Sequence, residues 1–257
     1  MKICLKSGSI LLVDPEAVFF DKDGTLIDIH HYWGAMIKIR ADLVCRRLYR
    51  NDGSRATIRN QLIEAMGLEI ETEKLNRQGP IGVKPRSAIV DIVGKTLRTG
   101  GHQLSDSSIE EIFVEVDSIT AKDLSQFLKL LPGVRKLLIS LRRTEVPAFV
   151  LTTDLTSRAK MAMESLNIDS YFEAIFGGDS VANTKPAPDL VERAVQHGRY
   201  NIDRVAVIGD HQVDIQMGIN AGVQVNVGVT TGLSNKDDFR ALPCQLVEDL
   251  TEIEIRN

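Results

Sequence analysis

The hydrophobic pattern of this chain contains two kinds of segment. Short apolar runs alternate with segments whose apolar residues recur three or four positions apart. Because strand and helix patterns take turns in this way, the chain predicts an α/β fold with a doubly wound parallel sheet. The predicted strands are residues 17–20, 146–151, 173–177, 204–209 and 223–229, and the predicted helices are residues 134–143, 156–166, 187–198 and 213–221.

Residues 31–127 interrupt that alternation with helical spacing alone. Four groups of apolar residues in this segment predict four amphipathic helices. We therefore expect an all-helical domain at residues 30–128. It is inserted into a core domain that consists of residues 1–29 and 129–257.

The N-terminal residues predict one further piece of sheet. Two short apolar runs, residues 3–6 and 10–13, flank the turn residues Ser7, Gly8 and Ser9. This arrangement predicts a β-hairpin. We expect the hairpin to extend an edge of the parallel sheet.

Two carboxylates directly follow the first buried strand. Asp21 and Asp23 stand at positions i and i+2, so they share a face, and Gly24 allows the backbone to turn sharply beyond them. Because two close acids repel each other, the pair predicts a neutralising partner such as a divalent cation with oxygen ligands.

Polar residues after three later strands can complete such a site. Thr152 and Thr153 follow a strand where hydroxyls and turn amides readily bind anions. Lys185 precedes a proline-started helix, and its ammonium suits a phosphate. Asp210 ends another strand and Asp214 follows about one turn later, so both could face the same cation.

These elements resemble the four motifs of the haloacid dehalogenase (HAD) superfamily, in the same order. The motifs are the D-K-D-G-T-L stretch at 21–26, Thr152, Lys185 with Pro186, and Gly209-Asp210 with Asp214-Ile215. Four motifs in order are far more specific than one short match. The resemblance covers roughly residues 14–28 and 130–232. The helical insertion is similar to the cap that many HAD phosphatases, such as the phosphoglycolate phosphatases, carry after the first motif.

The resemblance implies a phosphatase that hydrolyses a small phosphorylated metabolite through an aspartyl-phosphate. Asp21 would be the nucleophile, and Asp23 would protonate the leaving alcohol and later activate water. Thr152, the Thr153 amide and Lys185 would hold the phosphoryl group.

The same resemblance implies a Mg²⁺ site. Its ligands would be Asp21, Asp210, Asp214 and the backbone carbonyl of Asp23, because an oxygen shell suits Mg²⁺ better than a metal that prefers nitrogen or sulfur. Lys22 stands where several family members have an apolar residue. We assign it only its backbone amide, which could point at the phosphate, and we give its side chain no role.

Two other functions use similar chemistry. A phosphomutase of the same superfamily would form the same aspartyl-phosphate and return the phosphoryl group to a rebound intermediate. Thr25, where mutases of the family often have valine, favours the phosphatase. A phospho-aspartate signalling protein of the receiver type is the second alternative, but its chain would be about half as long and would lack the helical insertion.

The helical insertion holds the candidates for substrate selection. Its glycine- and proline-rich loop at residues 76–86 brings Arg77, Lys84 and Arg86 together, and these cations could bind an anionic substrate. His30 and His31 follow the first motif closely and could touch the substrate. We expect the insertion to be a mobile lid with hinges near residues 28–30 and 128–131.

The composition excludes several kinds of partner. Among 257 residues, 31 Lys and Arg oppose 35 Asp and Glu, and the net charge of −4 gives no general attraction for nucleic acid or an anionic membrane. Cys4, Cys45 and Cys244 form no C-x-x-C pair, which fits a reducing compartment, so we expect a cytoplasmic protein. We find no apolar segment suited to a signal peptide or a membrane span. The sequence leaves the oligomeric state open.

Overall fold

The computed structural model describes residues 1–49, 55–81 and 84–256. Contacts divide the chain into two compact units. Unit 1 comprises Met1–Asp28 with Leu128–Asn257, and unit 2 comprises Ile29–Phe127.

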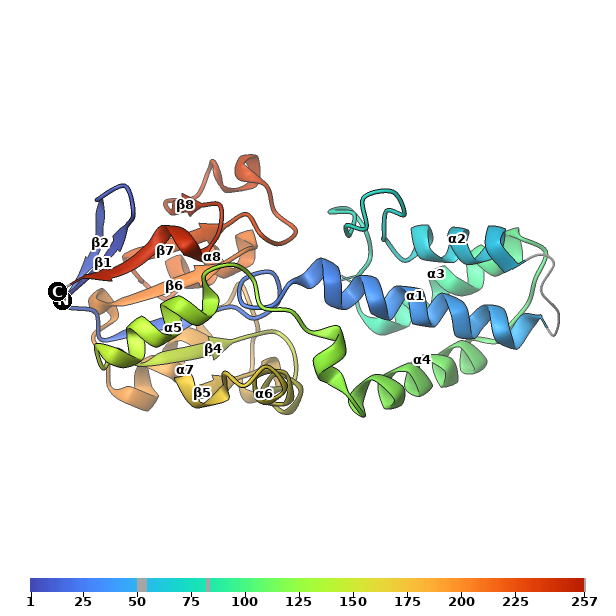
Figure 1. Ribbon diagram of the computed structural model, residues 1–257, viewed down its shortest axis with the longest axis horizontal. Coiled ribbons are helices and arrows are strands. Elements are labelled where there is room, and N and C mark those ends of the chain that lie inside the picture. Colours follow the sequence, from blue (N-terminus) through green and yellow to red (C-terminus); the bar gives the residue numbers. More distant parts are fainter. Residues whose placement is uncertain (50–54, 82–83, 257) are drawn as a thin grey trace. The chain divides into compact units, whose positions relative to one another are not determined.

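The main sheet of unit 1 confirms the predicted fold class. All neighbouring strands are parallel and lie in the order β5-β4-β3-β6-β7-β8 (Figure 1). Five of them match the predicted apolar runs, and β8 was not predicted. The strands are β3 (Ala17–Phe20), β4 (Ala148–Leu151), β5 (Phe172–Phe176), β6 (Val205–Gly209), β7 (Val225–Val229) and β8 (Gln245–Val247).

Helices connect these strands and cover the sheet. Helix α7 packs against β4 and β5, whereas α8 packs against β6 and β7. Between the layers, the buried ring of Phe149 meets Phe19 edge to face at 5.4 Å and stacks on Phe176 at 6.3 Å. The α-helices are α5 (Val134–Arg143), α6 (Thr156–Ser165), α7 (Asp189–Gly198) and α8 (Gln212–Asn220), and the 3₁₀ turns are η2 (Asp169–Tyr171), η3 (Gly178–Ser180), η4 (Ile202–Arg204), η5 (Lys236–Phe239) and η6 (Leu250–Glu252).

The N-terminal hairpin forms as predicted, but its predicted position was wrong. Strands β1 (Lys2–Leu5) and β2 (Ile10–Val13) pair antiparallel, and β1 also pairs with β9 (Ile253–Arg256). The result is a separate three-stranded sheet in the order β2-β1-β9 rather than an extension of the main sheet (Figure 1). Helix α5 packs against β9, so this small sheet has a helix of its own.

Two segments beside the insertion are paired within unit 1. Ile27 forms an antiparallel bridge with Leu130, and the Asp28 amide donates to the carbonyl of Lys129 at 2.8 Å. The Leu131 amide donates in turn to the carbonyl of Leu26 at 3.0 Å. The chain therefore leaves and re-enters unit 1 along two hydrogen-bonded neighbours.

Unit 2 contains the four predicted helices. Helices α1 and α3 each contact both α2 and α4, and buried apolar residues such as Ile37, Leu62, Val93 and Phe113 fill the space between them. The elements are α1 (Ile29–Leu48), α2 (Arg55–Ala65), α3 (Arg86–Thr99), α4 (Asp106–Ala121) and η1 (Leu124–Phe127). Throughout the described part of the chain, every helix is too short or too polar to cross a membrane.

Candidate active site

The site residues follow three adjacent strands of the main sheet. Strand β3 lies between β4 and β6, and the carboxyl ends of parallel strands meet at one edge of the sheet. Asp21 follows β3, Thr152 follows β4 and Asp210 follows β6. From β3 the chain continues to β4 and β5 on one side, and it then crosses to β6, β7 and β8 on the other side. The strand order therefore reverses beside β3, where the site residues lie. Ligands bind at such points in open α/β sheets.

Three carboxylates and one ammonium form the centre of the site. One carboxylate oxygen each from Asp21, Asp210 and Asp214 lies within 4.8 Å of the others. Asp210 and Asp214 are only 3% and 2% exposed. The Lys185 Nζ lies 2.5 Å from Asp21 Oδ1 and 2.7 Å from Asp214 Oδ1. The structure thus brings together four residues that the sequence analysis drew from three separate motifs.

Glycines make room for this acidic cluster. A β-carbon on Gly24, whose φ is +93°, would lie 2.4 Å from Asp210 Cγ, and one on Gly232 would lie 1.7 Å from Asp210 Oδ2. The amide of Leu233 then donates to that oxygen at 3.1 Å. The Gly24 turn was expected from the sequence. Gly232 was missed, although it closes a T-T-G turn directly after β7, where a loop beside the site could have been suspected.

The cap of helix α8 orients Asp214. His211 is the N-cap residue, and its ring Nδ1 accepts from the Val213 amide at 3.3 Å. The His211 amide donates to Asp214 Oδ2 at 2.9 Å, which completes a capping box. One oxygen of Asp214 is therefore held by its own helix, and the other faces Lys185. From the sequence, His211 was expected to be a loop residue between two acids of the site, whereas the structure makes it the N-cap of α8.

Burial and repulsion make this cluster electrostatically costly. Burial, opposed by the nearby Lys185 ammonium and reinforced by Asp214, raises the pKa of Asp21 to about 7. Burial, together with repulsion from Asp21 and Asp214, raises the pKa of Asp210 well above its usual value. For Lys185, burial alone would lower the pKa, but attraction to Asp21 and Asp214 outweighs it and raises the pKa. The lysine therefore stays charged.

The donor set of the cluster fits a hard divalent cation. All three acidic side chains present oxygens, and Lys185 supplies a single positive charge against three carboxylates. A cation placed among them would reduce the repulsion and favour their ionised forms. Oxygen ligands of this kind suit Mg²⁺ better than metals that prefer nitrogen or sulfur.

Thr152 and Thr153 occupy the end of β4. Thr152 is buried, and its amide donates to the carbonyl of Phe176 at 3.0 Å. Its Oγ1 accepts from the Asp154 amide at 3.2 Å, so the hydroxyl proton is left to donate elsewhere. Thr153 is exposed. Within the described residues, no hydrogen bond joins either threonine to the acidic cluster.

The side chain of Lys22, to which the sequence analysis gave no role, is buried between two acids. Its Nζ lies 2.8 Å from Asp23 Oδ2 and 3.0 Å from Asp154 Oδ2. Burial alone would lower the pKa of Lys22, but attraction to these two carboxylates outweighs it and raises the pKa. The sequence could not reveal this contact, because Asp154 lies 132 residues away along the chain.

Of the three candidate cations for substrate selection in unit 2, Arg86 is already paired with acids. Arg86 is the first residue of α3, and its guanidinium lies 2.7 Å from Glu110 and 2.5 Å from Asp117. Arg77 and Lys84 are exposed, and part of their loop, residues 82–83, lies outside the described residues.

The two histidines of α1 have different surroundings. The ring Nδ1 of His30 accepts from the Leu75 amide at 3.1 Å, so this side chain contributes to the packing of unit 2. His31 is exposed. His30 is half-buried, so His31 is the more accessible of the two.

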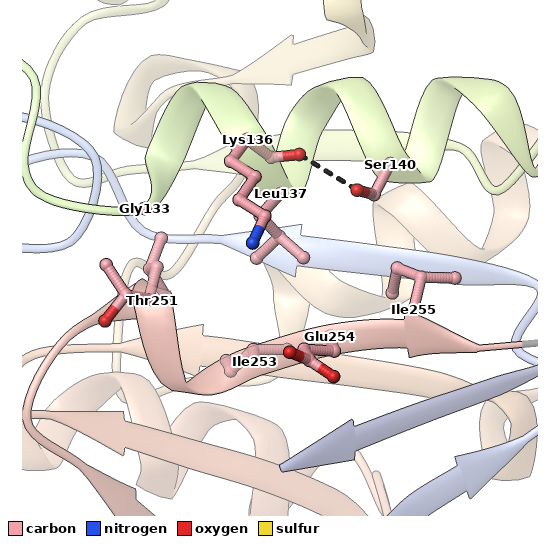
Figure 2. A pocket seen from close by; sticks show the side chains of 9 residues that line it. Gly133, Lys136, Leu137, Ser140, Thr251, Ile253, Glu254 and Ile255 are labelled. Atoms are coloured by element: carbon pink, nitrogen blue, oxygen red, sulfur yellow. Dashed lines mark hydrogen bonds between the residues drawn. The ribbon is translucent and has the colours of Figure 1, made fainter. Parts of the chain in front are cut away.

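A pocket of about 140 Å³ lies elsewhere in unit 1, between α5 and β9 (Figure 2). Within it, the Ser140 hydroxyl donates to the backbone carbonyl of Lys136 at 3.0 Å. No member of the acidic cluster lines this pocket, so it is distinct from the candidate active site. Its lining residues are Gly133, Lys136, Leu137, Ser140, Leu250, Thr251, Ile253, Glu254 and Ile255.

The parallel sheet and the aspartate–lysine cluster at its carboxyl edge are those of a HAD-type hydrolase. The family model for haloacid dehalogenase-like hydrolases matches residues 15–222, and the chain belongs to this family. The resemblance found in the sequence is thereby confirmed.

Several relatives carry phosphatase names. The chain is 26% identical over 212 residues to the 6-phosphogluconate phosphatase of Escherichia coli, covering 82% of this chain and 80% of that protein. It is 27% identical over 207 residues to the phosphoglycolate phosphatase of Rhodobacter capsulatus, covering 80% and 81%. A shorter match, 30% over 118 residues, is to "Probable phosphatase IndB" of Dickeya dadantii; it covers 46% of this chain and about half (51%) of that relative.

A solved structure supports the same fold. A Thermotoga maritima protein described as a "putative beta-phosphoglucomutase" superimposes with a TM-score of 0.68 at 20% identity, covering 91% of this chain and 95% of that one. At this identity the likeness concerns the fold alone.

Proposed function

We propose that this hydrolase is a Mg²⁺-dependent phosphatase that cleaves a small phosphorylated metabolite through an aspartyl-phosphate on Asp21. The observation that carries the proposal is the buried cluster in which Lys185 contacts both Asp21 and Asp214 while Asp210 lies beside them. A nucleophilic carboxylate, a fixed ammonium and a set of oxygen ligands are what an in-line phosphoryl transfer requires. The phosphatase names of the relatives support the same reaction.

The proposed reaction has two steps. In the first, an Asp21 carboxylate oxygen attacks phosphorus, the bond to the leaving-group oxygen breaks, and Asp23 gives that oxygen a proton. In the second, water attacks the phosphorus of the aspartyl-phosphate and gives a proton to Asp23, and the bond to Asp21 breaks. Inorganic phosphate leaves and both aspartates return to their starting forms.

The remaining side chains stabilise charge on the phosphoryl group. The Lys185 ammonium is already directed at Asp21 and would lie beside the oxygens transferred to it. The Thr152 hydroxyl, whose proton has no acceptor among the described residues, would donate to one of those oxygens. The amides of Lys22 and Thr153 are the proposed backbone donors.

Mg²⁺ would be held by the carboxylates of Asp21, Asp210 and Asp214 and by the backbone carbonyl of Asp23. When bound, the cation supplies positive charge that offsets the phosphoryl oxygens and the crowded acids. The chain's own contribution is to fix the ligands. His211 and Lys185 hold the two oxygens of Asp214, and the Leu233 amide holds Asp210.

Unit 2 is the proposed site of substrate selection. The relatives are named for 6-phosphogluconate and phosphoglycolate, which each carry a carboxylate besides the phosphate. The exposed Arg77 and Lys84 suit such a second anionic group. Arg86 is a weaker candidate than the sequence analysis held, because Glu110 and Asp117 already neutralise it.

A phosphomutase is the second candidate, and the fold shared with the Thermotoga protein is the observation that favours it. Inorganic phosphate release and isomer formation should be measured in parallel with Mg²⁺ on sugar phosphates, sugar-acid phosphates, phosphoglycolate and nucleotides. A phosphatase releases phosphate from at least one of these esters without forming an isomer. Isomer formation without net phosphate release would contradict the phosphatase proposal and support the phosphomutase.

A further inference from the structure

Outside the acidic cluster, the Lys22 ammonium is a buried charge that contacts Asp23, the proposed acid of the reaction. The residue is 4% exposed, and its Nζ lies between Asp23 Oδ2 at 2.8 Å and Asp154 Oδ2 at 3.0 Å. A charge removed from water in this way is stable only with well-placed partners. The Lys22 ammonium and the carboxylates of Asp23 and Asp154 therefore form one ion triad, and moving any member of the triad disturbs the other two.

Asp154 fixes one end of this ion triad. Its Oδ1 accepts from the Leu155 amide at 2.8 Å and lies 3.8 Å from the Arg158 guanidinium on α6. Its backbone carbonyl accepts from the Gly178 amide at 2.9 Å. Because both the backbone and one carboxylate oxygen are held, Oδ2 offers Lys22 an anchor that belongs to the loop after β4.

Asp23 is the other end, and its two carboxylate oxygens differ. Oδ2 is held by Lys22, whereas Oδ1 has no hydrogen-bond partner among the described residues. A carboxylate on a short side chain can rotate unless something holds one of its oxygens. Here one oxygen is held, and the other is left for an incoming group.

We propose that Lys22 is a positioning residue that holds the Asp23 carboxylate in the orientation from which it serves the leaving-group oxygen, with Asp154 as its second anchor. The inference rests on the proposed function, in which Asp23 exchanges protons with that oxygen and with water. It gives a role to a side chain for which the sequence indicated none.

A direct role in phosphate binding is the competing explanation, and the geometry disfavours it. Two carboxylates already surround the Lys22 ammonium, so an approaching phosphate would meet two negative charges as well as one positive charge. Lys185 is better placed for that role, since it contacts the proposed nucleophile itself. The two roles also predict different kinetics.

The test compares Lys22→Met with the parent protein on two esters in the presence of Mg²⁺. One is p-nitrophenyl phosphate, whose leaving group needs little protonation. The other is the alkyl ester that the parent hydrolyses fastest in the panel described above. Lys22→Met should lower kcat for the alkyl ester by about 10- to 100-fold and for p-nitrophenyl phosphate by less than about 5-fold, with KM nearly unchanged.

Two further variants keep the proposal testable if Lys22→Met fails to fold, as judged by thermal unfolding. Lys22→Arg retains the charge and should keep more of the alkyl-ester activity than Lys22→Met. Asp154→Asn removes the charge of the anchor at nearly constant volume. Its loss of kcat should lie between those of Lys22→Arg and Lys22→Met, and it should again be larger for the alkyl ester than for p-nitrophenyl phosphate. Lys160→Met is the matched control, because this exposed lysine of α6 pairs, among the described residues, with Glu164 on its own helix alone, and both activities should persist.

Asp23→Asn separates this inference from the proposed function. In that background, Lys22→Met should cause no additional ester-dependent loss, because the carboxylate it positions is absent. If Asp23→Asn shows the ester dependence and the Lys22 and Asp154 variants lose both activities equally or change only KM, the positioning role is wrong and the phosphatase proposal stands. If Asp23→Asn also loses both activities equally, the acid role of Asp23 is wrong and the positioning role of Lys22 falls with it, whereas the phosphatase proposal falls only if the parent protein releases no phosphate from any ester of the panel.

Discussion

At Asp21, burial and attraction act in opposite directions. Burial favours the neutral acid, the Lys185 ammonium 2.5 Å away favours the carboxylate, and the net effect of its surroundings is to raise the pKa of Asp21 to about 7. The carboxylate is the form that the proposed nucleophile needs. A bound cation would act in the same direction as Lys185. The protonation state of this residue therefore depends on its neighbours.

Replacing Asp21 with asparagine tests that residue directly. Asp21→Asn keeps nearly the same volume and replaces the nucleophilic carboxylate with a neutral, weakly nucleophilic amide, so multiple-turnover phosphate release should fall by about 10⁴-fold or more. Thermal unfolding should remain cooperative. Sustained phosphate release by this variant, well above that of a buffer blank, would contradict the assignment of the nucleophile.

Gly232 offers a second test at the residue scale. The β-carbon of Gly232→Ala would overlap Asp210 Oδ2, so the carboxylate must move and Mg²⁺ affinity should fall by about 10-fold or more. Gly222→Ala is the control. Its φ is +85° and its β-carbon would have no neighbour within 4 Å, so it should cost about 1 kcal/mol of stability and leave Mg²⁺ binding unchanged. Calorimetric titration with Mg²⁺ compares the two, and equal affinities would count against a cation ligand at Asp210.

At the scale of elements, the sequence predicted what local pattern can encode. The apolar runs gave β3 to β7, and the polar residues directly after those strands gave the acidic cluster, because parallel strands bring their ends together. Strand β8 was missed, since three residues at a sheet edge carry little pattern. The partnership of β1 with β9 was missed for another reason: the two strands are far apart in the chain, and local spacing says nothing about distant pairing. The Lys22–Asp154 contact escaped for the same reason.

The cap of α8 connects an element to the site. His211→Ala removes the side chain that accepts from the Val213 amide, so the free energy of unfolding should fall by about 1 kcal/mol. His211→Asn restores an efficient N-cap and should recover most of that loss. Urea unfolding measures both. If the asparagine variant is no more stable than the alanine variant, the capping role of the side chain is wrong.

At the scale of the whole molecule, each unit has its own buried core, and the proposed cation belongs to unit 1 alone. Saturating Mg²⁺ at 100 times its Kd would stabilise the folded state by about 2.7 kcal/mol, because only that state assembles the ligands. EDTA should therefore lower Tm and abolish phosphate release, and added Mg²⁺ should restore both.

Asp210→Ala completes that experiment. It should weaken Mg²⁺ binding more than it destabilises the metal-free protein, because it removes a carboxylate that Asp21 and Asp214 repel. Activity should be lost in parallel with affinity. An Asp210→Ala protein that binds Mg²⁺ as tightly as the parent and still releases phosphate would show that the cation site lies elsewhere.

The short antiparallel pairing at Ile27 and Leu130 has a consequence for how this fold diversifies. Because hydrogen bonds of unit 1 itself hold the two ends of the insertion side by side, the sheet does not depend on what lies between them. The entropic cost of closing a loop grows only slowly with its length, by about 0.6 kcal/mol for each doubling. The core can therefore accept insertions of different length and structure at this position. A different insertion could be accommodated between the same two segments while the carboxylates of the acidic cluster keep their places.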